Sequence, residues 1–452
     1  MNSESSALDN VDDSVSQEQF SYYQTFKYDF SKPLMSLCST KNLFNQTVSQ
    51  SLQKMFNAKQ ELGYIPNGTE GNFFKTAKWS PDGTCILTSS NDNILRVFNL
   101  YVIPLYTLVM VYVYTLAFSY RPFNIFDANE EQDMVPAIYS HSGESVYECC
   151  WYPQMSSQDP STCFFLASSR EHPVHLWDAY TGKLKCSFTI INHREQVIGP
   201  NSLTFNLDGS RIYCGYKNMI KTYYTDRPGS DGEEYPTTPT RKSKEGQKGV
   251  ISCLAFNPDR SSLYAAGSYS QSIGLYDEYN NELLFLLRGT LNEPIGGVQF
   301  SPSGHYLFST SRRNNSICCW DIRNSGEILY RLQRRGDTNQ KLSFDIDYSG
   351  KFLITGDQEG NIITYDLADP DDDGVPRQFI IVDTVSAATF HPYSPLIASC
   401  SGQRKFDFLV NENIKINFIE NNDQLGSLEA DIVEDNSLKI WKVEGNFEWH
   451  LY

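Results

Sequence analysis

Short apolar strands alternate with polar turns along most of the chain, and one arrangement recurs seven times. In each unit an aromatic residue precedes a tight turn, as in Trp79-Ser80-Pro81-Asp82-Gly83. About twenty residues later a further apolar run ends in an aromatic residue, often followed by Asp. The aromatic starts are Trp79, Trp151, Phe205, Phe256, Phe300, Phe344 and Phe390. The matching strand ends are Phe98, Trp177, Tyr223, Tyr276, Trp320, Tyr365 and Trp441.

The spacing of the units predicts the architecture. From Trp151 onward, successive aromatic starts are 54, 51, 44, 44 and 46 residues apart. A repeat of this length and signature is typical of WD-repeat propellers. Each unit is a four-stranded sheet that cannot bury both faces alone, and stacking the units in a ring solves this problem. The sequence therefore predicts an all-β fold, a seven-bladed WD-repeat β-propeller with a disordered N-terminus and inserted loops.

The remaining segments give a domain plan. Residues 1–19 are polar and acidic, and we expect them to be disordered. Residues 20–70 form a lead-in segment, within which aromatic positions in 20–35 alternate enough to form a strand that closes the last blade. The propeller occupies residues 71–445, with long loops at 226–248 and 406–434. Within the first of these loops, Thr238-Pro239 fits a proline-directed phosphorylation site, although a solvated loop is the simpler interpretation.

Residues 101–121 interrupt the first unit, and the part from Tyr101 to Tyr120 carries no charge and is rich in Val, Leu and Tyr. Its apolar part is long enough to span a bilayer, but a span here would divide one blade between two sides of a membrane. The interval from Trp79 to Trp151 is 72 residues, and without these 21 residues it would match its neighbours. We therefore interpret the stretch as an in-frame insertion, for which an unspliced short intron is one source, and expect no membrane association.

Composition restricts the chemistry. The net charge of −17 argues against binding nucleic acid through bulk charge, although a local basic patch can exist on an acidic protein. The eleven cysteines include no CxxC pair and fall mostly in predicted strands, which favours buried, reduced thiols in an intracellular protein. The first residues carry no secretory signal.

Catalytic and metal-binding motifs are not evident. The chain shows no glycine-rich phosphate loop, nucleophile elbow or HExxH motif, so we expect neither an enzyme nor a cofactor. His172 and His175 would point to opposite faces of a strand, which disfavours a metal pair. His141 and His193 lie where WD repeats place a structural histidine before the first strand.

The loops that join the second and third strands of each unit carry the candidate site. In a propeller these loops share one rim of the central channel, and here four of the seven contain Arg or Lys. Arginine stacks on bases and grips phosphates, and tyrosine stacks on bases, so the rim suits a short single-stranded RNA loop. Solvated loops or contacts with a partner protein remain open alternatives. The candidate RNA-binding residues are Arg170, Lys217, Tyr269, Arg312, Arg313, Gln403 and Arg404.

Several longer strings are more specific than the repeat itself. They comprise residues 71–75, 79–88, 92–96, 167–182, 267–269, 338–340, 344–345 and 398–404. In these strings the chain resembles the telomerase Cajal body protein family, over about residues 70–405 apart from the insert.

The resemblance implies a nuclear WD-repeat protein without catalytic activity. Members of the family bind the CAB-box loop of small Cajal-body RNAs and, where it is present, telomerase RNA. They direct these particles to Cajal bodies and associate with the box H/ACA core proteins, including dyskerin, with coilin and the SMN complex as neighbours. A protein-only scaffold that binds peptide tails or assembly partners is the alternative.

Overall fold

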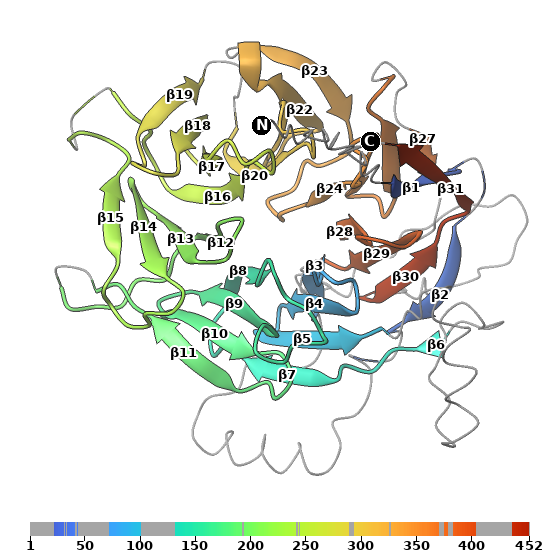
Figure 1. Ribbon diagram of the computed structural model, residues 1–452, viewed down its shortest axis with the longest axis horizontal. Coiled ribbons are helices and arrows are strands. Elements are labelled where there is room, and N and C mark those ends of the chain that lie inside the picture. The colour runs from blue at the N-terminus through green and yellow to red at the C-terminus, as the bar shows by residue number, and fades with distance from the viewer. Residues whose placement is uncertain are drawn as a thin grey trace, which may run out of the picture.

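The computed structural model describes residues 22–30, 32, 34–40, 43, 72–100, 132–191, 194–240, 243, 245–288, 293–324, 327–369, 375–377, 383–403 and 436–451. The predicted disordered segment 1–19, the insert 101–121 and the loop 406–434 lie outside these residues. Within them the fold is a seven-bladed β-propeller, as predicted, with the blades arranged around a central channel (Figure 1). In this part of the chain no helix is both long and apolar enough to cross a membrane.

Six blades are four-stranded sheets, and their strands are consecutive in the chain except in blade 1, from which β6 is missing. Blade 1 comprises β3 (Phe74–Trp79), β4 (Cys85–Ser90), β5 (Ile94–Asn99) and β7 (Ile138–His141). Blade 2 comprises β8 (Val146–Trp151), β9 (Phe164–Ser169), β10 (Val174–Asp178) and β11 (Leu184–Phe188). Blade 3 comprises β12 (Ser202–Phe205), β13 (Arg211–Tyr216), β14 (Met219–Tyr224) and β15 (Glu233–Pro236). Blade 4 comprises β16 (Ile251–Phe256), β17 (Leu263–Ser268), β18 (Ser272–Asp277) and β19 (Leu283–Leu287). Blade 5 comprises β20 (Ile295–Phe300), β21 (Tyr306–Ser311), β22 (Ser316–Asp321) and β23 (Ile328–Gln333). Blade 6 comprises β24 (Phe344–Ile346), β25 (Phe352–Gly356), β26 (Ile362–Asp366) and β27 (Val375–Arg377).

Blade 7 joins the two ends of the chain. Its strands β28 (Val385–Phe390), β29 (Leu396–Ser401) and β30 (Leu438–Lys442) are followed in the sheet by β2 (Met35–Ser39) and then by β6 (Gln132–Asp133). β2 pairs antiparallel with β30, so residues from the start of the chain close the ring.

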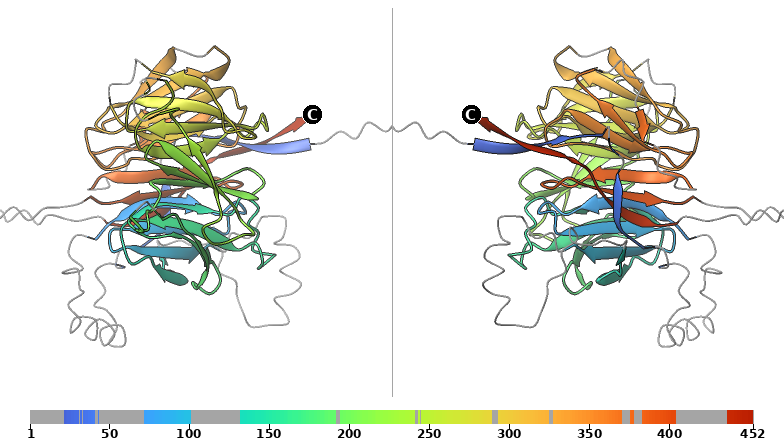
Figure 2. Two further views of the ribbon diagram at one scale, coloured as in Figure 1. Left: turned by 90° about the vertical axis from the view of Figure 1, so that its left-hand side faces the viewer. Right: turned by 90° about the vertical axis from the view of Figure 1, so that its right-hand side faces the viewer.

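The closing strand differs from the expected one. Residues 20–35 were expected to close blade 7, but β1 (Tyr22–Tyr28) pairs instead with β31 (Gly445–Leu451) in a separate two-stranded ribbon. The ribbon projects from the disc (Figure 2). β2 closes the blade because Leu37 and Cys38 are buried between blades 7 and 1. The alternating aromatic residues on which the prediction was based belong to the ribbon strand β1.

Three further expectations need correction. The stretch 226–248, expected to be a loop, contains β15, the outer strand of blade 3, in which Pro236 is tolerated because it lies at a sheet edge. Thr238 is only 8% exposed, so the suggested phosphorylation site is buried. In blade 6 the position before the turn is Ile346, and Phe344 begins the strand instead of ending it.

The turns between first and second strands share one geometry. Gly83, Gly209, Gly304 and Gly350 all have φ between 71° and 74°, a backbone conformation that favours glycine. Each donates its N–H to the carbonyl three residues earlier, at 2.9 to 3.1 Å. The Pro-x-Gly and x-x-Gly signals in the sequence therefore mark one recurring tight turn.

Each pair of neighbouring blades encloses an apolar cluster. For example, blades 5 and 6 bury Phe308, Ile317, Leu353 and Tyr365 between them. Ile354, the next residue after Leu353, belongs to the cluster between blades 6 and 7. Because successive side chains of a strand point to opposite faces, each blade packs against both neighbours.

A buried histidine joins blade 7 to blade 1. The Nε2 atom of His391 lies 3.0 Å from the carbonyl oxygen of Gly83, and its Nδ1 accepts N–H bonds from Tyr393 and Ser394 at 2.9 Å. Nδ1 accepts, so Nε2 carries the proton and donates to Gly83. The ring also packs edge-on against Trp79 at 4.6 Å. Burial lowers the pKa of His391 to about 4, although the Gly83 carbonyl and Asp82 oppose this effect.

The lowered pKa of His391 predicts acid sensitivity of the ring. In the unfolded chain His391 takes up a proton below about pH 6.5, whereas the folded ring resists protonation down to about pH 4. The contribution of neutral His391 to the free energy of unfolding is therefore fully present above pH 6.5. It is lost as the pH falls toward 4, by up to about 3 kcal/mol. In His391→Asn the amide oxygen can accept the two N–H bonds, and the titration is absent.

Urea unfolding of both proteins between pH 7 and pH 4.5 checks this expectation. The stability advantage of the wild type over His391→Asn should shrink as the pH falls. Asp345, whose pKa burial raises to about 6, titrates in the opposite sense but does so in both proteins. A difference that stays constant across this range would contradict the assignment.

Candidate ligand-binding face

The two faces of the disc differ in their connections. One face, here called the turn face, carries the turns between first and second strands, such as residues 80–84. The opposite face, here called the loop face, carries the loops between second and third strands, such as residues 170–173, 269–271 and 312–315. The first strand of each blade is innermost, and these strands line the central channel (Figure 1). The channel has a volume of 2410 Å³ and a lining that reaches from Pro81 and Pro302 on the turn face to Arg312 and Gln403 on the loop face.

Arg312 and Tyr269 come together at the mouth of the channel. The Arg312 guanidinium lies over the Tyr269 ring, 5.0 Å from its centroid, and joins blades 5 and 4. Both side chains are half-buried. The Nε atom of Arg312 is buried without a hydrogen-bond partner among the described residues. The contact orients a cation and an aromatic ring side by side, which is an arrangement that suits a base and its phosphate.

Arg313 holds a segment that covers part of the mouth. Its Nε donates to Asn339 Oδ1 at 2.8 Å, and its backbone N–H donates to the Thr338 carbonyl at 3.1 Å. Residues 337–341, here called the mouth loop, all line the channel. From the other side, Gln340 Nε2 donates to the Gly402 carbonyl of blade 7 at 3.0 Å. Arg313 is exposed, so it can also face a ligand.

A buried arginine anchors the base of the mouth loop. Arg334 is 5% exposed and donates to Thr355 Oγ1 at 2.6 Å and to the Leu342 carbonyl at 3.3 Å. Burial lowers its pKa to about 10, a value at which the guanidinium still carries its charge at neutral pH. The mouth loop therefore starts from a fixed point in the wall of the ring.

The other predicted site residues are less closely grouped. Gln403 lines the channel and donates to Asp383 Oδ1 at 3.2 Å. Arg170 and Lys217 are exposed on the loop face at blades 2 and 3, outside the channel lining, and Arg170 pairs with Glu171 at 3.4 Å. Arg404 lies outside the described residues. The structure therefore brings Tyr269, Arg312, Arg313 and Gln403 to the mouth and leaves Arg170 and Lys217 further out.

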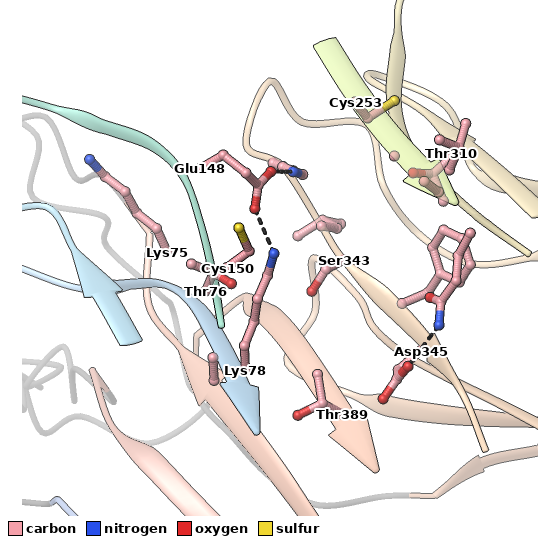
Figure 3. Close-up of a pocket in the computed structure, with 18 of the residues that line it drawn as sticks. Lys75, Thr76, Lys78, Glu148, Cys150, Cys253, Thr310, Ser343, Asp345 and Thr389 are labelled. Carbon is pink, nitrogen blue, oxygen red and sulfur yellow. Dashed lines mark hydrogen bonds and ion pairs between the residues drawn. The ribbon is translucent and has the colours of Figure 1, made fainter. Parts of the chain in front are cut away.

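An ion triad lies inside the channel. Glu148 of β8 accepts from Lys78 of β3 at 2.7 Å and from Lys341 at 2.5 Å (Figure 3). Lys341 comes just before blade 6, whereas Glu148 belongs to blade 2, so the second ion pair crosses the channel. Burial raises the pKa of Glu148, but the two ammonium groups outweigh burial and bring this pKa down to about 2. Glu148 is therefore a carboxylate at any physiological pH.

The channel lining carries an excess of positive charge. Its charged residues in the described part of the chain are Lys75, Lys78, Arg312, Arg313, Lys341 and Lys351 against Glu148, Asp337 and Asp345. Burial raises the pKa of Asp345 to about 6, so this carboxyl is still mostly ionised at neutral pH and takes up a proton in mild acid. The whole chain has a net charge of −17, so the channel differs in sign from the protein average.

Other sites do not gather comparable chemistry. In the described residues no group of three or more His, Cys, Asp or Glu side chains is placed to hold a metal ion. Eight of the eleven cysteines are buried, and burial raises the pKa of Cys149 and Cys150 to about 12. His141 ends β7 and is exposed, and His193 lies outside the described residues.

Sequence reasoning missed the channel residues Lys78, Glu148 and Lys341. A signal for Glu148 is present in the sequence, because β8 is an apolar strand interrupted by a single charge, and the two lysines of β3, Lys75 and Lys78, mark that inner strand as polar. Lys341 carries no such signal, since it lies in a loop and reaches Glu148 across the ring.

Comparison with known proteins agrees with the fold. Residues 67–99 match the family description "WD domain, G-beta repeat", and residues 254–373 match "Lactonase, 7-bladed beta-propeller". Among curated proteins, the human Telomerase Cajal body protein 1 is 39% identical over 345 residues, covering 74% of this chain and 58% of the human protein.

Two more distant relatives extend the comparison. The Drosophila melanogaster Telomerase Cajal body protein 1 homolog is 28% identical over 87% of this chain and 70% of its own length. The Schizosaccharomyces pombe Guanine nucleotide-binding protein negative regulator 1 is 30% identical over 72% of this chain and 75% of its own length. The chain spans less than two thirds of the mammalian relatives that it matches.

The anchoring of the mouth loop by Arg313 predicts a local change in mobility. Arg313→Lys keeps the charge but removes the Nε donor to Asn339. We expect the amides of residues 337–341 to exchange with deuterium about tenfold faster, because the loop is then held by one hydrogen bond fewer. Arg323→Lys, which affects an exposed Arg–Asp pair on the turn face, is the matched control. Equal exchange in the two variants would show that Arg313 does not hold the loop.

Proposed function

Because the chain belongs to the telomerase Cajal body protein family, we propose that it is a non-catalytic WD-repeat scaffold that binds RNA on its loop face. The RNA is the CAB-box loop of small Cajal-body RNAs and, where it exists, of telomerase RNA. The names of the relatives connect those proteins with telomerase and Cajal bodies. We therefore assign this chain to the nucleus and the Cajal body, where it directs H/ACA-type particles.

The observation that supports this proposal best is the cationic mouth of an acidic protein. Arg312 of blade 5 and Tyr269 of blade 4 are stacked there, and Arg313 of blade 5 and Gln403 of blade 7 also lie at the mouth. Single-stranded RNA is bound through base stacking on aromatic rings and through cationic grooves that follow the phosphates. A general negative charge would repel RNA, so the reversal of sign at the mouth favours binding at this place over any other.

The proposed partners follow from the same role. An RNA held at the mouth would bring its own proteins close to the loop face, namely the box H/ACA core including dyskerin. Coilin and the SMN complex are the proposed neighbours within the Cajal body. The turn face lies on the other side of the disc and stays accessible while RNA is bound.

A protein-only scaffold is the second candidate. It is favoured by exposed apolar side chains on the outer strands of blades 4 and 5, where Leu284, Phe285 and Leu329 are 50 to 56% exposed. Such side chains at the edge of a disc suit contact with another protein. The name of the Schizosaccharomyces pombe relative also refers to a protein and not to RNA.

Crosslinking of the protein in cells followed by RNA sequencing distinguishes the two candidates. We expect recovery of box H/ACA RNAs with crosslinks concentrated at their CAB-box loops. Libraries without enrichment over an untagged control would favour the protein-only scaffold.

Neutralising the mouth should weaken RNA binding. Arg312→Gln with Arg313→Gln removes two cationic side chains, and we expect the salt dependence to flatten by about 0.7 log unit for each RNA phosphate that is no longer neutralised. The measurement is a fluorescence titration with a CAB-box RNA at several salt concentrations. Arg227→Gln with Arg260→Gln removes the same charge from exposed positions on the turn face and is the matched control. Equal affinity of the two folded double variants would exclude Arg312 and Arg313 from the site.

A further inference from the structure

Two lysines in the channel share one carboxylate. Lys78 and Lys341 contact different oxygens of Glu148, at 2.7 and 2.5 Å. Two ammonium groups against one carboxylate leave one positive charge without a counter-charge within this triad. Lys75, whose Nζ lies 3.1 Å from Ser145 Oγ, adds a further cation to the same wall. The triad is therefore not neutral, and a second anion is electrostatically favoured beside it.

Apart from Lys75 and the Asp345 carboxyl, the labelled side chains around the triad are neutral hydrogen-bonding groups. Thr76, Cys150, Cys253 and Ser343 lie around it in the channel (Figure 3). Burial raises the pKa of the Cys253 thiol to about 11, although Lys341 opposes this effect, so the thiol adds no negative charge at neutral pH. Hydroxyl groups can donate to an anion without competing with it, which makes the wall compatible with an oxyanion.

Both lysines are accessible from the channel. The side chains of Lys78 and Lys341 are 38% and 37% exposed, whereas that of Glu148 is 11% exposed. The two lysine side chains are therefore more open to an anion in the channel than the carboxylate side chain is. Arg312 and Arg313 stand at the mouth above, so the positive charges extend inward from the loop face.

We propose that Lys78 and Lys341 form a phosphate-binding site inside the channel, at which a ligand phosphate replaces the Glu148 carboxylate as their common counter-ion. A phosphate presents more acceptor oxygens than a carboxylate and can carry more charge, so it satisfies both ammonium groups better. Glu148 then acts as an internal competitor that occupies the site when no ligand is present.

The source of the phosphate rests on the proposed function. An RNA strand bound at the mouth can place one backbone phosphate in the channel, and Lys341 lies at the end of the mouth loop that such a strand would touch. A free phosphate compound has the same chemistry and would reach the same site. These two sources differ in whether the mouth residues contribute to binding.

If Glu148 competes with the ligand, its removal should increase the affinity for phosphate. Glu148→Gln keeps the size of the side chain but removes the competing charge, so phosphate ligands should bind more tightly, by about three- to tenfold. Lys341→Gln removes one of the two cations, so binding should weaken by about tenfold. If the triad only stabilised the fold, neither variant would bind phosphate ligands more tightly than the wild type.

The experiment measures binding of two probes, inorganic pyrophosphate by calorimetry and a short labelled single-stranded RNA with a CAB-box sequence by fluorescence. Glu327→Gln, an exposed carboxylate on the turn face, controls for the general effect of removing a negative charge. Thermal melting confirms that each variant is folded. If Glu148→Gln does not fold, the comparison of Lys341→Gln with the wild type still tests the site.

The outcomes separate the site from the proposed function. Tighter binding by Glu148→Gln than by Glu327→Gln, with weaker binding by Lys341→Gln, supports the site. If pyrophosphate follows this order and RNA does not bind to any variant, the site is supported and the proposed RNA function is wrong. If RNA binds with equal affinity to the wild type, Glu148→Gln and Lys341→Gln, the site is overturned and the RNA function is retained. Lack of binding of either probe to the wild type overturns both.

Discussion

Every blade must bury two faces at once, and this requirement organises the molecule. Successive residues of a strand point to opposite sides, so Leu353 packs toward blade 5 and Ile354 toward blade 7. The same is true of Ala265 and Ala266 in blade 4. No blade can satisfy this demand without both neighbours, so the stability of the ring is shared among the interfaces instead of residing in one core.

Closing the ring requires contacts between residues far apart in the sequence. β2 supplies the outer part of blade 7, and its Leu37 packs in the cluster between blades 7 and 1. On the inner side, Trp79 donates its indole N–H to the Thr389 carbonyl at 3.3 Å, and His391 bonds to Gly83. The junction between the first and last blades is thus held at its outer edge by a strand and near the channel by side chains. Both of these hydrogen bonds join residues more than 300 positions apart.

The sequence predicts features that repeat and misses features that do not. The number of blades, the tight turns and the position of loops on one face follow from local signals that recur. The closing strand, β15 and the register at Phe344 were misjudged because each depends on a partner strand or on burial, which local alternation and a single proline do not reveal. The stacking of Arg312 on Tyr269 was not foreseen as a contact, although both residues were selected. The pairing of Lys341 with Glu148 across the channel is beyond any local pattern, since it depends on the diameter of the ring.

The ribbon of β1 and β31 has a consequence for how the protein is connected to other polypeptides. It starts where β30 ends, with Asp29 donating its N–H to the Glu444 carbonyl at 2.8 Å, and therefore leaves the disc from the turn face. The paired strands run antiparallel, so Tyr22 and Leu451 lie together at its far end. A polypeptide joined directly to Tyr22 or Leu451 would therefore leave the ribbon on the side away from the mouth. The mouth and the far end of the ribbon lie on opposite sides of the disc, so that contacts made at one need not obstruct contacts made at the other.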